Sequence, residues 1–127
     1  MILMVLVTLL LMNKPDQEES CVTLEEFSKV RLRMGKIIHA ENIPGTKKVV
    51  KVKVDIGSDQ RDIAVGVAPH YKAEELVGRV VVVCANLCPR KIGNVISNGM
   101  LLAADGPGGK PIFLTTREDC TIGASIR

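Results

Sequence analysis

Apolar and charged residues alternate most regularly near position 50, in the run Val50-Lys-Val-Lys-Val-Asp-Ile56. This period of two is typical of a strand with one buried face and one charged, solvated face. Shorter apolar runs bounded by turn residues predict further strands. The strands expected from these patterns cover residues 32–38, 50–56, 62–67, 79–84, 100–104 and 111–115.

Two short segments depart from the strand pattern and predict helical turns. Thr23-Leu-Glu-Glu26 has the form of a capping box, in which the threonine and the second glutamate each accept a hydrogen bond from the other's backbone N–H. A helix is therefore expected over residues 24–29, with Leu24, Phe27 and Val30 on one apolar face. A second helical turn is expected over residues 71–76, closed by Gly78.

Strands in steady succession, with a small helix between the third and the fourth, predict an all-β fold. The expected fold is a five-stranded barrel of the oligonucleotide/oligosaccharide-binding (OB) type, with a short N-terminal helix and an extra C-terminal strand region. A β-sandwich is the alternative, although it does not require the small helix. Gly35 lies where a barrel strand often bends, and residues 106–109 predict a hairpin loop.

The first 22 residues are expected to lie outside the folded domain, which then spans residues 23–127. Residues 1–12 are almost entirely apolar, but a membrane span needs roughly 20 such residues and a signal peptide needs a leading positive charge. Three interpretations remain, in order of preference: an artefactual upstream start with Met12 as the true initiator, an arm that packs on a partner subunit, or a weak export signal. Residues 13–20 are polar and predict a linker.

Composition adds a mild basic excess and no sign of a metal site. Sixteen of the 17 basic residues and 11 of the 14 acidic residues lie from Ser20 onward, a net charge of +5. This excess fits an anionic partner as well as an ordinary solvated surface. The nearest two of the four cysteines, Cys84 and Cys88, lack the spacing of a zinc site, so neither a metal nor another cofactor is expected. Without a disulfide pattern, a reducing, cytoplasmic location is expected.

Motifs of hydrolases, phosphate-binding loops and metalloenzymes are missing, which predicts a protein that is not an enzyme. Aromatic residues are nearly absent too: the chain has Phe27, Tyr71 and Phe113 and no tryptophan. Domains that hold single-stranded nucleic acid usually stack bases on such rings. A nucleic acid bound here is therefore expected to be recognised through phosphates, hydroxyls and shape, which suits a folded RNA.

Six blocks follow one another along the chain: FSKVRLRMGKI, VDIG, YKAEELVG, ANLCPRK, SNGMLLAA and GASIR. In their order and spacing they resemble the tRNA-binding domain family. Its members include free-standing dimeric tRNA-binding proteins, the beta subunit or C-terminal domain of methionyl-tRNA synthetase, and the endothelial monocyte-activating polypeptide. The resemblance implies non-catalytic binding of tRNA in support of methionyl-tRNA synthetase. No membrane partner is expected, because the apolar segment 1–12 is too short for a span.

The resemblance also implies the residues that contact tRNA, which are Lys48, Asn86, Arg90, Ser97 and Met100. Their side chains offer positive charge for phosphates, an amide, a hydroxyl and an adaptable apolar surface. For Met100, the start of a buried run remains an equally open interpretation. The sequence departs from the family at Lys47, where an aspartate is usual, and at Gly93 and Asn94, in a loop expected after Pro89.

A rival function is that of an export chaperone resembling CsaA, which has the same barrel and dimer but holds unfolded peptides. The intact block Ser97-Asn-Gly-Met100 favours the tRNA-binding interpretation. A docking subunit that does no more than bind a synthetase is a third possibility.

A homodimer is expected because both ends of the chain carry apolar residues that a five-stranded barrel does not need. They are Leu24, Phe27 and Val30 in the helix and Ile112, Leu114, Ile122 and Ile126 near the C-terminus. The resemblance implies pairing through these terminal segments. The alternative is a monomer whose terminal segments fold back over its own barrel.

Overall fold

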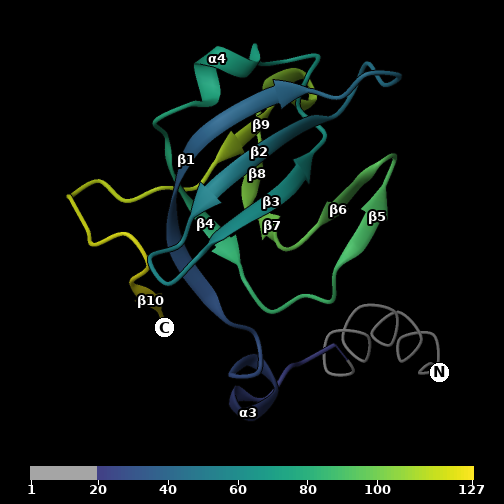
Figure 1. Cartoon of the computed structure of the whole chain (residues 1–127). Helices are drawn as coiled ribbons and strands as arrows, with labels where there is room; N and C mark the ends of the chain where they lie inside the picture. The colour runs from purple at the N-terminus through teal and green to yellow at the C-terminus, as the bar shows by residue number, and fades with distance from the viewer. Residues whose placement is uncertain (1–19) are drawn as a thin grey trace, which may run out of the picture.

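One long strand, β1 (Leu32–Asn42), organises the fold because it pairs with strands on both sides. Its first part, up to Lys36, pairs with β4 (Val80–Cys84), and the part from Lys36 onward pairs with β2 (Val50–Asp55). The sheet order is β3-β2-β1-β4-β7, with every pair antiparallel (Figure 1). The computed structural model describes residues 20–127, so the apolar segment 1–12 and most of the expected linker lie outside the described residues.

The sheet curls so that β3 (Gln60–Val65) approaches the chain that leads into β7 (Met100–Leu101). Asn98 donates its backbone N–H to the carbonyl oxygen of Asp62 at 2.8 Å, which joins these two sides. The result is a nearly closed five-stranded antiparallel barrel, and the expected OB-type fold is confirmed.

The barrel core contains the alternating valines that the sequence pattern placed on one face. Val50, Val52 and Val54 are fully buried, and the intervening residues of β2 face outward. Further fully buried side chains come from β1, β3 and β4, and Leu76 of α4 (Ala73–Leu76) packs among them. Complete burial of one such side chain stabilises the fold by about 1.5–3 kcal/mol.

The two expected helical turns are present, each somewhat shorter than expected. In α3 (Leu24–Phe27), Thr23 Oγ1 accepts from the Glu26 N–H at 3.0 Å, and Glu26 Oε1 accepts from the Thr23 N–H at 2.9 Å. The hydrogen bond from the Thr23 backbone lowers the pKa of Glu26 below its ordinary value. The helix ends two residues before the expected end at Lys29, because the Lys29 N–H bonds back to the Glu26 carbonyl in a tighter turn. Helix α4 lies between the third and fourth strands, as expected.

The segment after Pro89 was expected to be a loop, and this expectation is wrong. It forms a hairpin of β5 (Arg90–Ile92) and β6 (Val95–Ser97), in which Arg90 pairs with Ser97. A two-residue turn, Gly93-Asn94, joins the strands, and Gly93 has a positive φ of 62°. Gly-Asn between two short stretches that each contain a β-branched residue next to the turn, Ile92 and Val95, is a hairpin signal that the sequence does contain.

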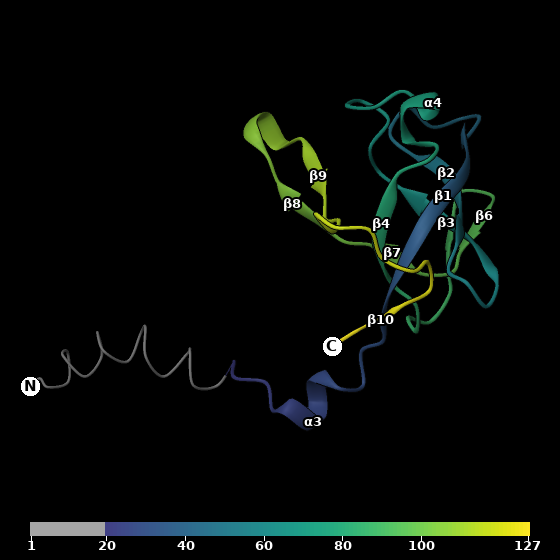
Figure 2. The same ribbon diagram turned by 90° about the vertical axis from the view of Figure 1, so that its left-hand side faces the viewer.

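The expected strand over residues 100–104 divides into two short strands with different partners. β7 stays in the barrel, whereas β8 (Ala103–Asp105) pairs with β9 (Pro111–Phe113) in a hairpin that stands off the barrel (Figure 2). The turn η2 (Pro107–Gly109) connects them, which confirms the expected hairpin loop. The Tyr71 hydroxyl donates to the Pro111 carbonyl at 2.7 Å and so ties this hairpin to the barrel.

The C-terminal residues return to the barrel and pair with the start of β1 through β10 (Ser125–Ile126). Gly123 donates its N–H to the Met34 carbonyl at 2.7 Å, and the Ala124 carbonyl accepts from the Met34 N–H at 3.0 Å. Gly57, in the β2–β3 turn, packs closely against Gly123. The C-terminal residues 123–126 therefore pack against their own barrel. No helix in the described part of the chain has the length and apolar character needed to cross a membrane.

Candidate nucleic-acid interface

Arg90 and Met100 line the same open pocket of about 480 Å³, together with Leu87 and Cys88. Arg90 begins β5, directly after the loop that follows β4, and Met100 begins β7 opposite Cys84. Met100 is 45% exposed, and the run after it, which was expected to be buried, is buried at Leu101 but exposed at Ala103 and Ala104. The structure thus combines a guanidinium group with an adaptable apolar surface in one place.

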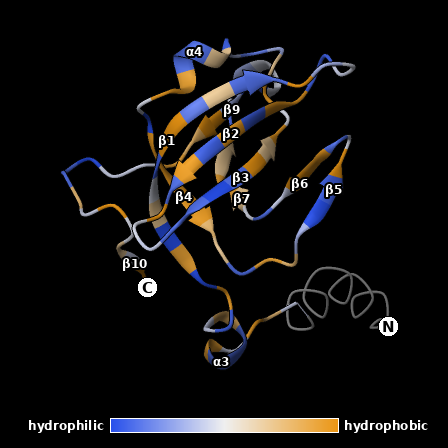
Figure 3. Ribbon diagram, in the orientation of Figure 1, coloured by the Kyte–Doolittle hydropathy of each residue, from blue (hydrophilic) through white to orange (hydrophobic). Residues whose placement is uncertain are grey.

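The positively charged side chains of Arg90 and Lys91, on β5 beside this pocket, are free to bind an anion. The ion pairs found among residues 20–127 are His39–Glu41, Lys53–Asp62 and Arg61–Asp59. Arg90 and Lys91 are both exposed and take part in none of them. Strand β5 accordingly stands out as hydrophilic (Figure 3). Exposed cations without an acidic partner are the groups that hold phosphates in nucleic-acid complexes.

Lys48 lies apart from the Arg90–Met100 pocket, in the loop between β1 and β2. Its side chain is exposed, and its backbone is fixed at two points. The Lys48 N–H donates to Thr46 Oγ1 at 3.1 Å, and its carbonyl accepts from the Ala68 N–H at 3.1 Å. Lys48 therefore offers a separate positive charge on an anchored loop.

Ser97 has a buried hydroxyl, with a relative exposure of 2%. Its Oγ accepts from the Ala64 N–H at 3.0 Å and donates to the Gly99 carbonyl at 3.3 Å. Gly99 has φ of +138°, and a Cβ placed on it would lie 3.1 Å from the Cys84 carbonyl oxygen. Both residues are therefore engaged in closing the barrel beside the pocket, and Met100 takes its exposed position directly after them.

This geometry predicts that Ser97→Ala lowers the free energy of unfolding by about 1–3 kcal/mol, because the Ala64 N–H loses its partner inside the protein. Chemical denaturation monitored by circular dichroism measures the change. Ser58→Ala is the matched control, since the Ser58 hydroxyl is exposed and bonds only the neighbouring Asp59 side chain. Equal stabilities of the two variants would contradict the structural role of Ser97.

Asn86 uses both ends of its amide on the backbone just before β1. Its Oδ1 accepts from the Arg31 N–H at 2.8 Å, and its Nδ2 donates to the Lys29 carbonyl at 2.6 Å. The resemblance implied that this amide contacts tRNA, and it did not point to Lys29 or Arg31. No pattern in the sequence could have linked these segments, which are more than 50 residues apart.

Arg61 joins the two loops that border the pocket. Its Nη1 donates to the carbonyl oxygens of Ala85 at 2.9 Å and Asn98 at 3.4 Å. Its Nε bonds Asp59 Oδ2 at 2.7 Å, and this hydrogen bond lowers the pKa of the Asp59 carboxyl below its ordinary value. The loop positions are thus held by a charged side chain from β3.

The described residues present few exposed aromatic rings on which bases could stack, and they form no cluster of metal-ligating side chains. Tyr71 and Phe113 are 7% and 9% exposed and pack on each other with ring centroids 5.5 Å apart. Phe27 of α3 is 51% exposed. Within residues 20–127, no three histidine, cysteine or acidic side chains come together as a metal site would require. The arrangement is suited to contacts with phosphates and sugars.

Comparison with known proteins identifies the family. Residues 32–125 match the family model described as a putative tRNA-binding domain. Methionine–tRNA ligase from Christiangramia forsetii is 44% identical over 107 residues, which make up 84% of this chain and 16% of that enzyme. The enzyme from Thermotoga maritima is 42% identical over 109 residues, 86% of this chain and 17% of the enzyme. The chain thus spans about one-sixth of the length of these curated relatives.

Solved structures show the same fold. The MetRS-related protein from Pyrococcus horikoshii is 34% identical, with a TM-score of 0.79 over 85% of this chain and 99% of that one. The chaperone CsaA from Bacillus anthracis is 22% identical, with a TM-score of 0.76 over 85% of this chain and 100% of that one. The fold, the match over most of the chain and the relatives agree, and the chain belongs to the family of putative tRNA-binding domains.

Proposed function

We propose that this protein binds folded tRNA without performing chemistry, and that it supports methionyl-tRNA synthetase in the cytoplasm. The observation that carries the proposal is the pocket that Arg90 lines together with the exposed residue Met100. The proposed contacts to tRNA are Arg90, Met100 and Lys48, while Ser97 and Asn86 shape the site from within the protein. Family membership supports tRNA as the partner.

The chemistry of the site favours a structured RNA. Guanidinium and ammonium groups bind phosphates, and the flexible Met100 side chain suits a sugar or a base face. Since two of the three aromatic rings are buried, stacking of successive unpaired bases has little support in the described residues. Recognition is expected to rest on the spacing of phosphates in a folded molecule.

Competition binding at several salt concentrations tests this function. Fluorescently labelled tRNA is expected to bind, and poly-U of equal length to compete weakly. The log–log plot of affinity against salt should fall by about 0.7–0.9 for each phosphate contact, because each contact releases counterions. No binding, a flat salt response or equal competition by poly-U would contradict the proposal.

Support of a synthetase follows from what the relatives contain. The curated relatives are methionine–tRNA ligases in which the matching segment is a small part of the chain. A tRNA-binding module that associates with a synthetase raises the local concentration of tRNA. Added to a methionyl-tRNA synthetase, this protein is expected to lower the KM for tRNA and leave kcat unchanged. An unchanged KM at saturating protein would contradict this part of the proposal.

A chaperone of unfolded peptides is the second candidate function. It has support in the apolar part of the pocket, where Leu87 and Met100 are 40% and 45% exposed, and in Ile96, which is 56% exposed on β6. The CsaA structures show that the same fold occurs in chaperones. Binding of a labelled unfolded protein that tRNA does not displace would favour this candidate.

We also propose a homodimer formed through the N-terminal helix. None of the residues of α3 is buried by the described part of the chain, and Leu24 and Phe27 are 83% and 51% exposed. Together with Val30 and Ile126 they line an apolar groove of about 240 Å³. Figure 3 shows α3 at one end of the molecule, with apolar positions among its residues. Apolar groups exposed in this way mark association surfaces.

Leu24→Glu is expected to convert the dimer to a monomer without unfolding it, because the side chain makes few contacts within its own barrel. Light scattering measures the mass, and a thermal melt checks the fold. Val77→Glu is the control: Val77 is 47% exposed and follows α4, at the opposite end of the molecule (Figure 1). A wild-type monomer, or a dimer that survives Leu24→Glu, would contradict the proposed interface.

A further inference from the structure

Three hydrogen bonds hold the segment before β1 against the loop that follows β4. Asn86 bonds the Arg31 N–H through Oδ1 and the Lys29 carbonyl through Nδ2, at 2.8 and 2.6 Å. The Ala85 N–H donates to the Arg31 carbonyl at 2.8 Å. Residues 29–31 are therefore fixed next to the loop that leads to Arg90, although they lie far from it in sequence.

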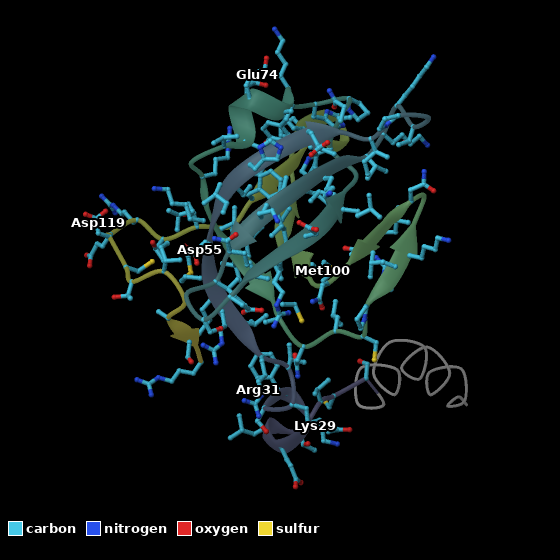
Figure 4. The ribbon with its side chains drawn as sticks, viewed as in Figure 1. Lys29, Arg31, Asp55, Glu74, Met100 and Asp119 are labelled. Atoms are coloured by element: carbon cyan, nitrogen blue, oxygen red, sulfur yellow. The ribbon has the colours of Figure 1, made fainter. Side chains whose placement is uncertain are left out.

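The fixed segment carries two exposed cations, Lys29 and Arg31. Neither takes part in the ion pairs found among residues 20–127. The nearby carboxylate of Glu26 is occupied by the Thr23 backbone and hydroxyl. Figure 4 shows Lys29 and Arg31 at the same end of the molecule, beside α3. Two positive charges thus lie on a rigid stretch of backbone and have no acidic partner there.

A polar pocket of about 160 Å³ adjoins this segment. Its polar lining comes from Arg31, Arg33, Ser28 and Ser125, and it shares Val30 and Ile126 with the apolar groove beside α3. The guanidinium of Arg33 is held in place because its Nη1 donates to the Gly123 carbonyl at 3.2 Å. Guanidinium and hydroxyl groups around a small pocket are the donors that bind a phosphate oxygen.

The loop after β4 connects the two pockets. Leu87, Cys88 and Arg90 line the first pocket, and Asn86 anchors the segment that lines the second. Four residues of extended chain span at most about 14 Å, so Asn86 and Arg90 are close enough for one RNA to reach both. Exposed cations thus lie at both ends of this loop, Arg90 at one end and Arg31, whose backbone Asn86 holds, at the other.

We propose that Arg31, assisted by Lys29, is a second phosphate-binding point for RNA, and that Asn86 is a positioning residue that holds it there. This inference rests on the proposed function and extends its surface. Asn86 acts through the backbone of residues 29–31, since both polar ends of its amide are already bonded. Truncating Asn86 is therefore expected to weaken RNA binding through misplacement of Arg31.

A double-mutant cycle tests the inference, with anisotropy of labelled, unfractionated tRNA as the measurement. Arg31→Gln is expected to weaken binding about fivefold and to reduce the salt slope by about 0.7–0.9. Arg31→Lys should retain most of the affinity, because it keeps the charge. The matched control is Arg117→Gln, since Arg117 is an exposed cation in the loop between β9 and β10.

Asn86→Ala is expected to weaken binding as well, but by much less when Arg31 is already glutamine. Residues that act through one another show such non-additive effects. If Asn86→Ala fails to fold in a thermal melt, Asn86→Thr takes its place in the cycle. Additive effects would show that Asn86 acts independently of Arg31 and would overturn the positioning role.

The outcomes separate this inference from the proposed function. If the wild-type protein binds tRNA and Arg31→Gln behaves like Arg117→Gln, the second phosphate-binding point is refuted and the proposed function stands. If the wild-type protein does not bind tRNA, both are refuted. Strong binding with the predicted loss in Arg31→Gln, restored in Arg31→Lys, supports the inference.

Discussion

Replacing Arg90 with alanine is expected to weaken tRNA binding about tenfold, since a charge-assisted contact to phosphate is lost. Arg90 is the cation that lines the pocket with Met100, and no ion pair among residues 20–127 engages it. The loss should be similar for every tRNA tested, because a phosphate contact carries little sequence information. Binding titrations with several purified tRNAs measure the effect.

Arg117→Ala is the control for Arg90→Ala, because it removes the same charge from an exposed loop on another part of the surface. A thermal melt should show that both variants stay folded, since both side chains are exposed. A loss confined to one tRNA would indicate that Arg90 reads a base. An equal loss in both variants would indicate that only the overall charge matters.

Gly123→Ala is expected to lower the free energy of unfolding by about 2–4 kcal/mol. Gly123 has φ of +93°, and a Cβ placed on it would lie 2.6 Å from the Ile56 carbonyl oxygen. The alanine therefore meets both an unfavourable backbone conformation and a clash with backbone that cannot move easily. The expected consequence is release of the C-terminal segment from β1, where Gly123 and Ala124 now bond Met34. Chemical denaturation measures the change.

Gly78→Ala separates the two causes. Gly78 has the same φ of +93°, but apart from its own chain neighbours no atom lies within 4 Å of the position of its Cβ. This variant should show the penalty for the backbone conformation alone, about 1–2 kcal/mol. If Gly123→Ala is no less stable than Gly78→Ala, the close contact between the C-terminal segment and the β2–β3 turn does not contribute to stability.

Local sequence patterns predicted most helices and strands of the fold. The errors lie where the existence or the bounds of a strand depend on the strand with which it pairs. The alternation in β2 and the capping box of α3 were both recognised, because each depends on neighbours in sequence. The hairpin β5–β6 was missed although Gly93-Asn94 signals it, since three-residue strands leave almost no periodicity. The division of residues 100–105 between β7 and β8 was also missed, because only the partner strands distinguish the two.

For single side chains of the candidate site, too, prediction from the sequence fails where contacts distant in the chain decide the outcome. Resemblance identified Arg90 and Met100, and the structure places them in one pocket. Ser97 and Asn86 came from the same resemblance, but the structure shows their polar atoms bonded within the protein. A sequence shows that a hydroxyl or an amide is present. Whether that group is free for a ligand depends on which backbone groups the fold brings to it.

The sequence by itself determined the class of the fold and the family, because alternation, caps and motif order are properties of residues close together in the chain. Only the tertiary structure decided which side chains of the candidate interface are free for a ligand and which are bonded within the protein. Contacts such as that between Asn86 and Arg31 join residues that are 55 positions apart. Such contacts follow from how the strands close into a barrel. The energy of a buried hydrogen bond depends on that closure and not on the local sequence.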